Sequence, residues 1–331
     1  MKRKVFSFNS ELFMVTGIQK VFMDIHHAIY DEYEAKIVGT IPFSKVHKDL
    51  DIQRKDYIRF LNPFMFYKSI VILHQRKFLP VFWLLNHVLF QKISVVYIHH
   101  NLFNNLRLLS VMPKTVVAIS DEGVRNLHEY FGVPKENIHK IYNCVDDVHP
   151  VKHNVYSGGI ANILYPGRIN DQKRQLMLVD MLKDKLTDKV KILFAGTGQD
   201  IDVLQDKIKD DTHFECLGYR SDIYALLQKC DFMMLFSGHE GLPISLIEAN
   251  MLGVPAICSD VGGNREIVEN GSNGFVINKD DWQQLVNTLN SLPDISVKTY
   301  QEMSSISRKR YLKYFTLEIF KKHYLELLKT L

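Results

Sequence analysis

Short apolar runs alternate with amphipathic stretches along the whole chain, a pattern that predicts an α/β protein built on parallel sheets. Ser120 stands directly before the stretch "DEGVRNLHEYF" and is expected to cap that helix, because a serine oxygen accepts hydrogen bonds from first-turn amides. In the first half we predict strands at Lys4–Phe8, Ala35–Ile41, Ser69–Leu73, Ser94–Ile98 and Thr115–Ile119, and helices at Gly17–Tyr30, Phe78–Gln91 and Asp121–Phe131.

The second half repeats this pattern after a polar segment, His149–Gly159, which is predicted to link two domains. The length of 331 residues also argues for two domains, which we place at residues 1–150 and 151–311. The tail Ile306–Leu331 is expected to form one or two amphipathic helices. The predicted strands are Ile160–Tyr165, Lys189–Ala195, His213–Leu217, Phe232–Phe236 and Ala256–Cys258, and the predicted helices are Arg174–Leu186, Ile201–Lys209, Ile223–Lys229 and Pro243–Leu252.

Composition and charge narrow the class of protein. No apolar run is long enough to span a bilayer, the start is too polar for a signal peptide, and the four cysteines form no CxxC pair, so a cytoplasmic protein is expected. The net charge of +4 is uneven, because residues 1–150 contain 19 Lys+Arg against 14 Asp+Glu. A basic first half indicates an anionic partner or a membrane surface, or merely scattered solvated lysines.

Candidate chemistry begins after the first strand of the second half. Arg168 and Lys173 lie five residues apart in "YPGRINDQK", and two cations near a helix N-terminus suit a diphosphate, although taken alone they are better explained as solvated surface charges. The next strand is followed by "FAGTGQD", in which Gly196 and Gly198 allow a tight turn. Because Ile201 stands where a dinucleotide fingerprint needs a third glycine, no nicotinamide cofactor is expected.

The stretch "GHEGLPISLIEAN" contains two glutamates, Glu240 and Glu248, eight positions apart. Pro243 is expected at the first helical position, so the amides of Gly241 and Leu242 would lie at a helix N-terminus, which attracts anions. Glu248 would lean back towards that end and suits the hydroxyls of a ribose. Glu240 in the loop suits a sugar in the same way, and for either glutamate alone a surface charge is the simpler interpretation.

The first half offers fewer candidates. His99 and His100 end a predicted strand, where ligands of α/β sheets bind, and Gly17 stands just before a helix. No zinc motif is present, and the strings Asp49–Asp51 and Asp200–Asp202 are better explained by capping and solvation than by a metal. No metal site is therefore expected.

Together these residues resemble the retaining, nucleotide-sugar-dependent glycosyltransferases of the GT-B fold, family 4. The resemblance rests mainly on the motif E-x7-E, from Glu240 to Glu248, which is followed by "AN", a glycine and a proline. The motifs "GR" with a later lysine, "GTG", "LGYRSD" and "GGNREIV…NGFV" follow in the family's order, and the match is close over about 160–275. Residues 1–93 match weakly, and Asn143–Cys144 replaces the usual asparagine-glycine before the linker.

The resemblance implies a fold and an activity. The fold would be two doubly wound Rossmann-like domains facing across a cleft, with residues 312–331 forming a C-terminal helix that packs back on the first domain. The activity would be hexosyl transfer from a UDP- or GDP-linked sugar to a glycan or glycolipid acceptor, in the synthesis of lipopolysaccharide, capsule or another cell-surface polysaccharide. No metal or other cofactor would be needed.

The resemblance also assigns roles to residues. Arg168 and Lys173 would hold the donor diphosphate, and His100, or His99 if the register slips, would approach the donor sugar. Glu240 would bind hydroxyls of that sugar and Glu248 those of the ribose. The other donor-binding residues implied are Gly17, Gly167, Gly196, Gly198, Tyr219, Arg220, Gly241, Leu242, Pro243 and Ile244.

The expected partners are a nucleotide sugar and a glycan or lipid-linked acceptor, and no nucleic acid. Peripheral contact with the anionic inner face of the cytoplasmic membrane stays open, because the apolar stretch Phe78–Phe90 follows Arg76 and Lys77. That stretch is either an interfacial helix or, as we favour, a buried core helix. Two alternative functions also remain: a UDP-N-acetylglucosamine 2-epimerase-like enzyme, or a non-catalytic nucleotide-sugar-binding protein of the same fold.

Overall fold

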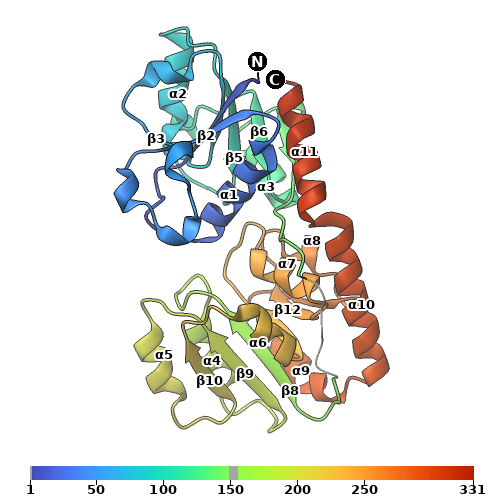
Figure 1. The fold of residues 1–331 in the computed structure, drawn as a ribbon. Coiled ribbons are helices and arrows are strands. Elements are labelled where there is room, and N and C mark those ends of the chain that lie inside the picture. The colour runs from blue at the N-terminus through green and yellow to red at the C-terminus, as the bar shows by residue number, and fades with distance from the viewer. Residues whose placement is uncertain (1, 149–155) are drawn as a thin grey trace. The chain divides into compact units, whose positions relative to one another are not determined.

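The computed structural model describes residues 2–148 and 156–331, so most of the predicted linker His149–Gly159 lies outside the described residues. The chain divides into two compact units, which are drawn in Figure 1. Unit 1 comprises Met1–Cys144 and Thr316–Leu331, and unit 2 comprises Val145–Phe315. Both are built on parallel sheets, as the alternation of apolar and amphipathic segments predicts.

Unit 1 contains a sheet of seven parallel strands in the order β3-β2-β1-β4-β5-β6-β7. The strand order reverses between β1 and β4, so the unit is doubly wound about that point. Its strands are β1 (Lys4–Phe8), β2 (Glu34–Gly39), β3 (Tyr57–Arg59), β4 (Ile70–Leu73), β5 (Ser94–His99), β6 (Thr115–Ala118) and β7 (Ile138–Lys140), and its helices are α1 (Gly17–Tyr30), α2 (Leu79–His87), α3 (Asp121–Arg125) and α11 (Leu317–Lys329).

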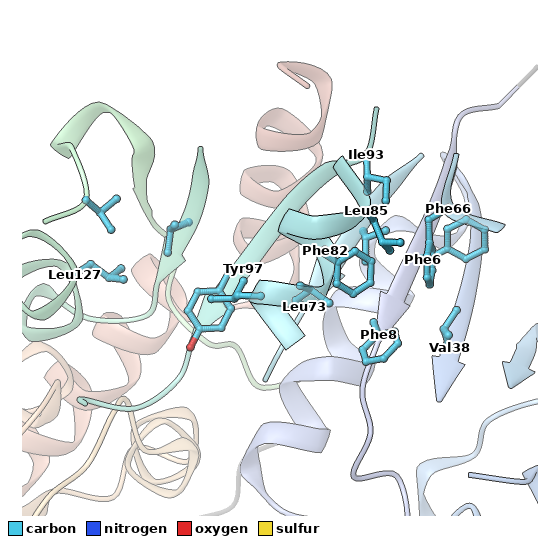
Figure 2. Packing of buried hydrophobic residues seen from close by; sticks show 14 of the residues in the cluster. Phe6, Phe8, Val38, Phe66, Leu73, Phe82, Leu85, Ile93, Tyr97 and Leu127 are labelled. Carbon is cyan, nitrogen blue, oxygen red and sulfur yellow. The ribbon is translucent and has the colours of Figure 1, made fainter. Parts of the chain in front are cut away.

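The two faces of this sheet receive different helices, because successive side chains of a strand point to opposite faces. Phe8 of β1 packs in the cluster that contains Phe82 and Leu85 of α2, shown in Figure 2. Ser7, its neighbour in the strand, lies 3.4 Å from His26 of α1. Helix α11 packs beside α1 (Figure 1), so residues 316–331 complete unit 1.

Unit 2 contains six parallel strands in the order β10-β9-β8-β11-β12-β13, and here the order reverses between β8 and β11. Its strands are β8 (Ala161–Pro166), β9 (Val190–Ala195), β10 (Phe214–Gly218), β11 (Phe232–Leu235), β12 (Ala256–Ser259) and β13 (Gly274–Ile277), and its helices are α4 (Gln175–Leu182), α5 (Ile201–Ile208), α6 (Ile223–Lys229), α7 (Ile244–Met251), α8 (Asn264–Ile267), α9 (Trp282–Ser291) and α10 (Val297–Tyr314).

The predicted elements agree with these closely where the periodic signal is long. Helices α1 and α6 have the predicted bounds, and Ser120 caps α3, accepting a hydrogen bond from the amide of Gly123 at 3.1 Å. The predicted helix Asp121–Phe131 is α-helical only through Arg125 and then continues as a π-helical turn over Asn126–Tyr130. The helical pattern is therefore correct, but its hydrogen bonding changes midway.

Three predictions need correction. The helix expected over Phe78–Gln91 ends at His87, and the chain then turns through a left-handed backbone at Phe90, with φ of 48°. Strands β3, β7 and β13 were not predicted; each is a short strand at the edge of its sheet. The tail helices begin at Val297 rather than Ile306. Within the described residues, no helix is both long and apolar enough to cross a bilayer.

Candidate active site

The candidate site of unit 2 lies where its strand order reverses. The loop after β8 contains Lys173 and the loop after β11 contains Glu240, and these two strands are neighbours in the sheet. Open α/β sheets bind ligands at such switch points, outside the carboxyl ends of the strands. Two residues predicted to contact a donor are therefore placed at the position where this kind of sheet binds ligands.

Lys173 and Glu240 form an ion pair across the switch point. Lys173 Nζ lies 2.7 Å from Glu240 Oε1, and the two side chains are only 16% and 8% exposed. A pair this far withdrawn from water interacts more strongly than a surface pair and holds both groups in one geometry. Separate roles were predicted for the two residues from the sequence, whereas in the structure each is the partner of the other.

The loops that carry this pair are tied together by hydrogen bonds. The hydroxyl of Tyr165, in β8, donates to the carbonyl of Lys173 and accepts from the amide of Phe236 at 3.0 Å. The amide of Gly238 donates to the carbonyl of Gln172 at 2.8 Å. Burial raises the pKa of Tyr165, so its hydroxyl remains a neutral donor. Tyr165 is a site residue that sequence reasoning missed, because a tyrosine in an apolar strand resembles any core residue.

Arg168 lies in the same loop as Lys173, but its side chain is exposed. Its carbonyl oxygen accepts a hydrogen bond from the Gln175 side chain at 2.9 Å, which fixes the backbone beside it. Arg174, which the sequence analysis did not single out, donates instead to the carbonyl of Lys279 at 2.6 Å and lies over the Trp282 ring. Of the cations in this loop, Lys173 is thus paired with Glu240, Arg174 supports the fold, and Arg168 is exposed to solvent.

Gly196 and Gly198, which were predicted to line the donor site, are glycines because backbone atoms of another loop leave no space for a side chain. A Cβ at Gly196 would lie 1.9 Å from the carbonyl oxygen of Gly167, and a Cβ at Gly198 would lie 2.0 Å from that of Ile169. The loop after β9 therefore rests directly on the loop after β8. Gly167 itself has φ of +144°, which side-chain-bearing residues rarely adopt.

Helix α7 begins one residue later than predicted. Pro243 is its N-cap with extended backbone, rather than its first helical residue, and Ile244 begins the helix. Glu248 lies in the second turn and accepts a hydrogen bond from the hydroxyl of Tyr224, in α6, at 3.2 Å. Before the helix, Leu242 is buried and the carbonyl of Gly241 accepts from the amide of Gly263 at 2.7 Å. The residues before the N-terminus of α7 are thus held in place by the burial of Leu242 and by the hydrogen bond from Gly263.

Tyr219 and Arg220 follow β10 and lie at the same edge of the sheet as the other loops. The Tyr219 side chain is 74% exposed. Arg220 is paired with Asp222 at 2.5 Å, directly before α6. The ring of Tyr219 is therefore accessible for stacking against a planar group of a ligand, whereas the guanidinium of Arg220 is held by Asp222.

Unit 1 has a cavity of about 500 Å³ at its own switch point, between the loops after β1 and β4. His100 lines this cavity and accepts or donates a hydrogen bond with buried His74 at 2.8 Å. His99 is instead bonded to Asn126 at 2.9 Å, away from the cavity lining. Gly17 begins α1, whose next residue, Ile18, borders the cavity. Of the two histidines, His100 is therefore the one that lines the cavity.

These histidines make the stability of the protein sensitive to acid. Burial lowers the pKa of His99 from 6.5 to about 4 and, with the charge of His99 added, that of His100 to about 3. The folded protein then binds fewer protons than the unfolded chain between pH 6.5 and about 4. Each histidine is therefore expected to reduce the free energy of unfolding by up to about 1.4 kcal/mol per pH unit as pH falls through this window. Urea denaturation between pH 7 and pH 4 measures this slope. It should be shallower in His99→Gln, and an equal slope in that variant would contradict the assignment.

Across residues 2–148 and 156–331, no cluster of three or more His, Cys, Asp or Glu side chains is arranged to hold a metal ion.

Residues 156–310 match the family described as Glycosyl transferases group 1. The part of the chain that carries Lys173, Glu240 and Glu248 is thus the part that is similar to group 1 glycosyltransferases.

Particular relatives are similar over the same region. The putative glycosyltransferase EpsD of Bacillus subtilis (strain 168) is 32% identical over 149 residues, which cover 42% of this chain and 39% of that protein. The UDP-Gal:alpha-D-GlcNAc-diphosphoundecaprenol alpha-1,3-galactosyltransferase of Escherichia coli is 29% identical over 139 residues, covering 40% of this chain and 36% of that protein. The matched segment spans less than half the length of these curated relatives.

A solved structure is similar over the whole chain. The crystal structure of Anabaena Alr3699/HepE in complex with UDP aligns with a TM-score of 0.83 over 99% of this chain and 100% of that one, at 19% identity. At this identity the likeness concerns the fold, and it confirms the predicted class of two parallel-sheet, Rossmann-like units of the GT-B type.

Proposed function

We propose that this protein is a retaining glycosyltransferase of family 4 that moves a hexose from a UDP- or GDP-linked donor to a glycan or lipid-linked acceptor in cell-surface polysaccharide or lipopolysaccharide synthesis. The observation that carries the proposal is the ion pair between Lys173 and Glu240 at the switch point of the part that is similar to group 1 glycosyltransferases. Two features of relatives support it. HepE was crystallised with UDP, and the Escherichia coli relative acts on a diphosphoundecaprenol-linked sugar, as its name states.

The chemistry follows from the charges at the site. Departure of a nucleoside diphosphate develops negative charge, and preorganised cations and amides aimed at that charge supply a large share of catalysis. Lys173 is held in place by Glu240 before any ligand arrives, and exposed Arg168 is the cation that can extend to the same diphosphate. The first-turn amides of α7, beginning at Ile244, add partial positive charge at the helix end.

Glu240 and Glu248 bind hydroxyls in this proposal. Glu240 Oε1 accepts from Lys173, and its carboxylate has further acceptor capacity for a donor-sugar hydroxyl. Glu248, beside the Tyr224 hydroxyl, binds the ribose, and exposed Tyr219 borders the nucleobase. In unit 1, the cavity beside His100 binds the acceptor.

We propose retention without a metal. The acceptor oxygen forms its bond to the anomeric carbon on the face that the diphosphate leaves, as the bond from that carbon to the diphosphate oxygen breaks. The departing diphosphate takes the acceptor proton, so no separate protein base is required. Lys173 and Arg168 then stabilise the nucleoside diphosphate product. We place the reaction in the cytoplasm, where thiols stay reduced, since none of the four cysteines, all within the described residues, forms a disulfide.

A panel of UDP- and GDP-sugars in thermal unfolding tests this function, because a ligand that binds only the folded protein raises the melting temperature. At least one donor should stabilise the protein, and Glu248→Ala should weaken its binding about ten-fold, since hydrogen bonds to a charged group contribute about 1.5–3 kcal/mol. Tyr224→Phe, which keeps the carboxylate, should weaken binding less. The exposed Glu215→Ala on β10 is the matched control and should bind normally.

Product analysis separates the proposed function from its alternatives. Slow release of nucleoside diphosphate, and faster release with acceptor, supports a transferase. Conversion of UDP-N-acetylglucosamine to its epimer without acceptor would instead identify an epimerase, and donor binding without any turnover would identify a non-catalytic binding protein.

A further inference from the structure

Helix α2 has an outer face that carries no charge. The helix contains no Lys, Arg, Asp or Glu. Leu79, Phe82 and Leu85 are buried in the core of unit 1, as the labelled Phe82 and Leu85 show in Figure 2. Trp83 and Leu84 lie on the opposite face and are 44% and 48% exposed. The outer face of a helix in a globular protein is normally charged or polar, so this face is unusual.

The apolar surface continues beyond the helix. Val88, Leu89 and Phe90 are exposed, and Phe90 is 73% exposed on a left-handed backbone, with φ of 48°. A large aromatic residue rarely adopts this conformation, which here turns its ring outward. The amide of Lys68 donates to the carbonyl of Gln91 at 2.9 Å, so the neighbouring loop lies alongside. We define the α2 surface as Tyr67, Lys68, Trp83, Leu84, Val88, Leu89, Phe90 and Lys92, all of which are exposed.

The segment of the sequence that carries the α2 surface has charges of one sign. Residues 57–120 contain seven Lys and Arg and no Asp or Glu, although the average frequency of the chain would place about seven acids there. Lys68 and Lys92 are exposed within the surface itself. A cavity of about 620 Å³ opens beside Trp83, with Phe82, Met112 and Pro113 also in its lining. The surface thus combines exposed aromatic side chains, a partly apolar groove and two exposed lysines, Lys68 and Lys92, which form no ion pair with the described residues.

We propose that the α2 surface docks on an anionic lipid bilayer. Tryptophan and other amphipathic side chains settle at the boundary between headgroups and acyl chains, and lysines beside them are attracted by anionic lipids. A protein partner would need a surface that is apolar and acidic and that also matches the shape of the α2 surface. An anionic bilayer is both apolar and negatively charged, and it can adapt to any shape. The stretch Phe78–Phe90 is therefore both core and interface: one face fills unit 1 and the other meets lipid. This proposal is independent of the proposed transfer reaction.

Vesicle flotation with the full chain tests the docking. Wild type should float with vesicles of phosphatidylcholine and phosphatidylglycerol and bind pure phosphatidylcholine far more weakly. Trp83→Glu should reduce binding about ten-fold or more, and Lys68→Gln or Lys92→Gln about five-fold each. Val203→Glu, at an exposed apolar position on α5, and Lys298→Gln, at an exposed position on α10, are the matched controls and should bind like wild type.

Phe90→Gly separates docking from folding. Glycine tolerates the positive φ at this position, so this variant should keep or raise the melting temperature while losing vesicle affinity. Equal binding to neutral and anionic vesicles, or normal binding by both Trp83→Glu and Phe90→Gly, would overturn the proposal. A dimer in sedimentation velocity that Trp83→Glu converts to monomer, with no vesicle binding by wild type, would overturn it too, because a second copy would then cover the surface.

Discussion

Replacing Lys173 by methionine is expected to lower turnover by about 10²–10³, because removal of one preorganised donor from a developing anion has this effect in other enzymes. Methionine keeps most of the length of the side chain and removes the charge together with its N–H donors. The measurement is the rate of nucleoside diphosphate release at saturating donor, with folding checked by circular dichroism. Near-normal turnover in the folded variant would contradict the assignment of Lys173 to the leaving group.

The ion pair complicates this variant, and a second substitution resolves it. Loss of Lys173 alone leaves the Glu240 carboxylate largely buried without its partner, which is expected to cost about 3 kcal/mol of unfolding free energy. Adding Glu240→Gln removes the unpaired charge, so the double variant should recover most of that stability and none of the turnover. Recovery of both together would mean that the pair serves the fold alone.

Gly198→Ala is expected to give the second large effect. The new Cβ would lie 2.0 Å from the carbonyl oxygen of Ile169 and 2.7 Å from its nitrogen, and both are backbone atoms that cannot simply rotate away. The loops after β8 and β9 must then separate, which should cost about 3 kcal/mol in urea denaturation. It should also lower turnover by about 10², since a displacement of about 1 Å can have that consequence.

Gly238→Ala is the matched control for this substitution. Gly238 lies in the loop after β11, and an added Cβ there would meet its nearest neighbour, the Arg174 side chain, at an ordinary 3.5 Å. It should change stability little. Similar losses in both variants would show that any side chain in these loops is harmful, and that the close approach of the loops after β8 and β9 has no special role.

Helices and their caps were predictable from the sequence wherever the pattern that specifies them lies within one short segment. Helix α1 follows from its apolar period, and the cap of α3 follows from one serine before an amphipathic stretch. The two glutamates of "GHEGLPISLIEAN" were singled out by their spacing, and their roles were assigned from the resemblance to family 4. The start of α7 was wrong by one residue, because Pro243 fits both the last extended position and the first helical one.

The partners of these residues were not predictable, because they depend on strand order. Lys173 and Glu240 are 67 residues apart, and they meet only because β11 pairs with β8 rather than with the strand before it in the chain. The choice between His99 and His100 is similar. Alternation places the two on opposite sides of β5, but only the positions of the surrounding loops decide which side is open. No sequence motif marked His74 or Tyr165 as residues of a site.

The division of unit 1 into two chain segments has a consequence for biosynthesis. Its first segment ends at Cys144, and the helix that covers α1 is supplied by residues after Thr316. Phe320, Tyr324 and Leu328 of that helix are buried, so the unit lacks part of its core until they emerge from the ribosome. Unit 2 is continuous and is complete first. The half of the chain that is translated first must therefore finish folding last, with α1 unshielded and open to chaperones in the interval.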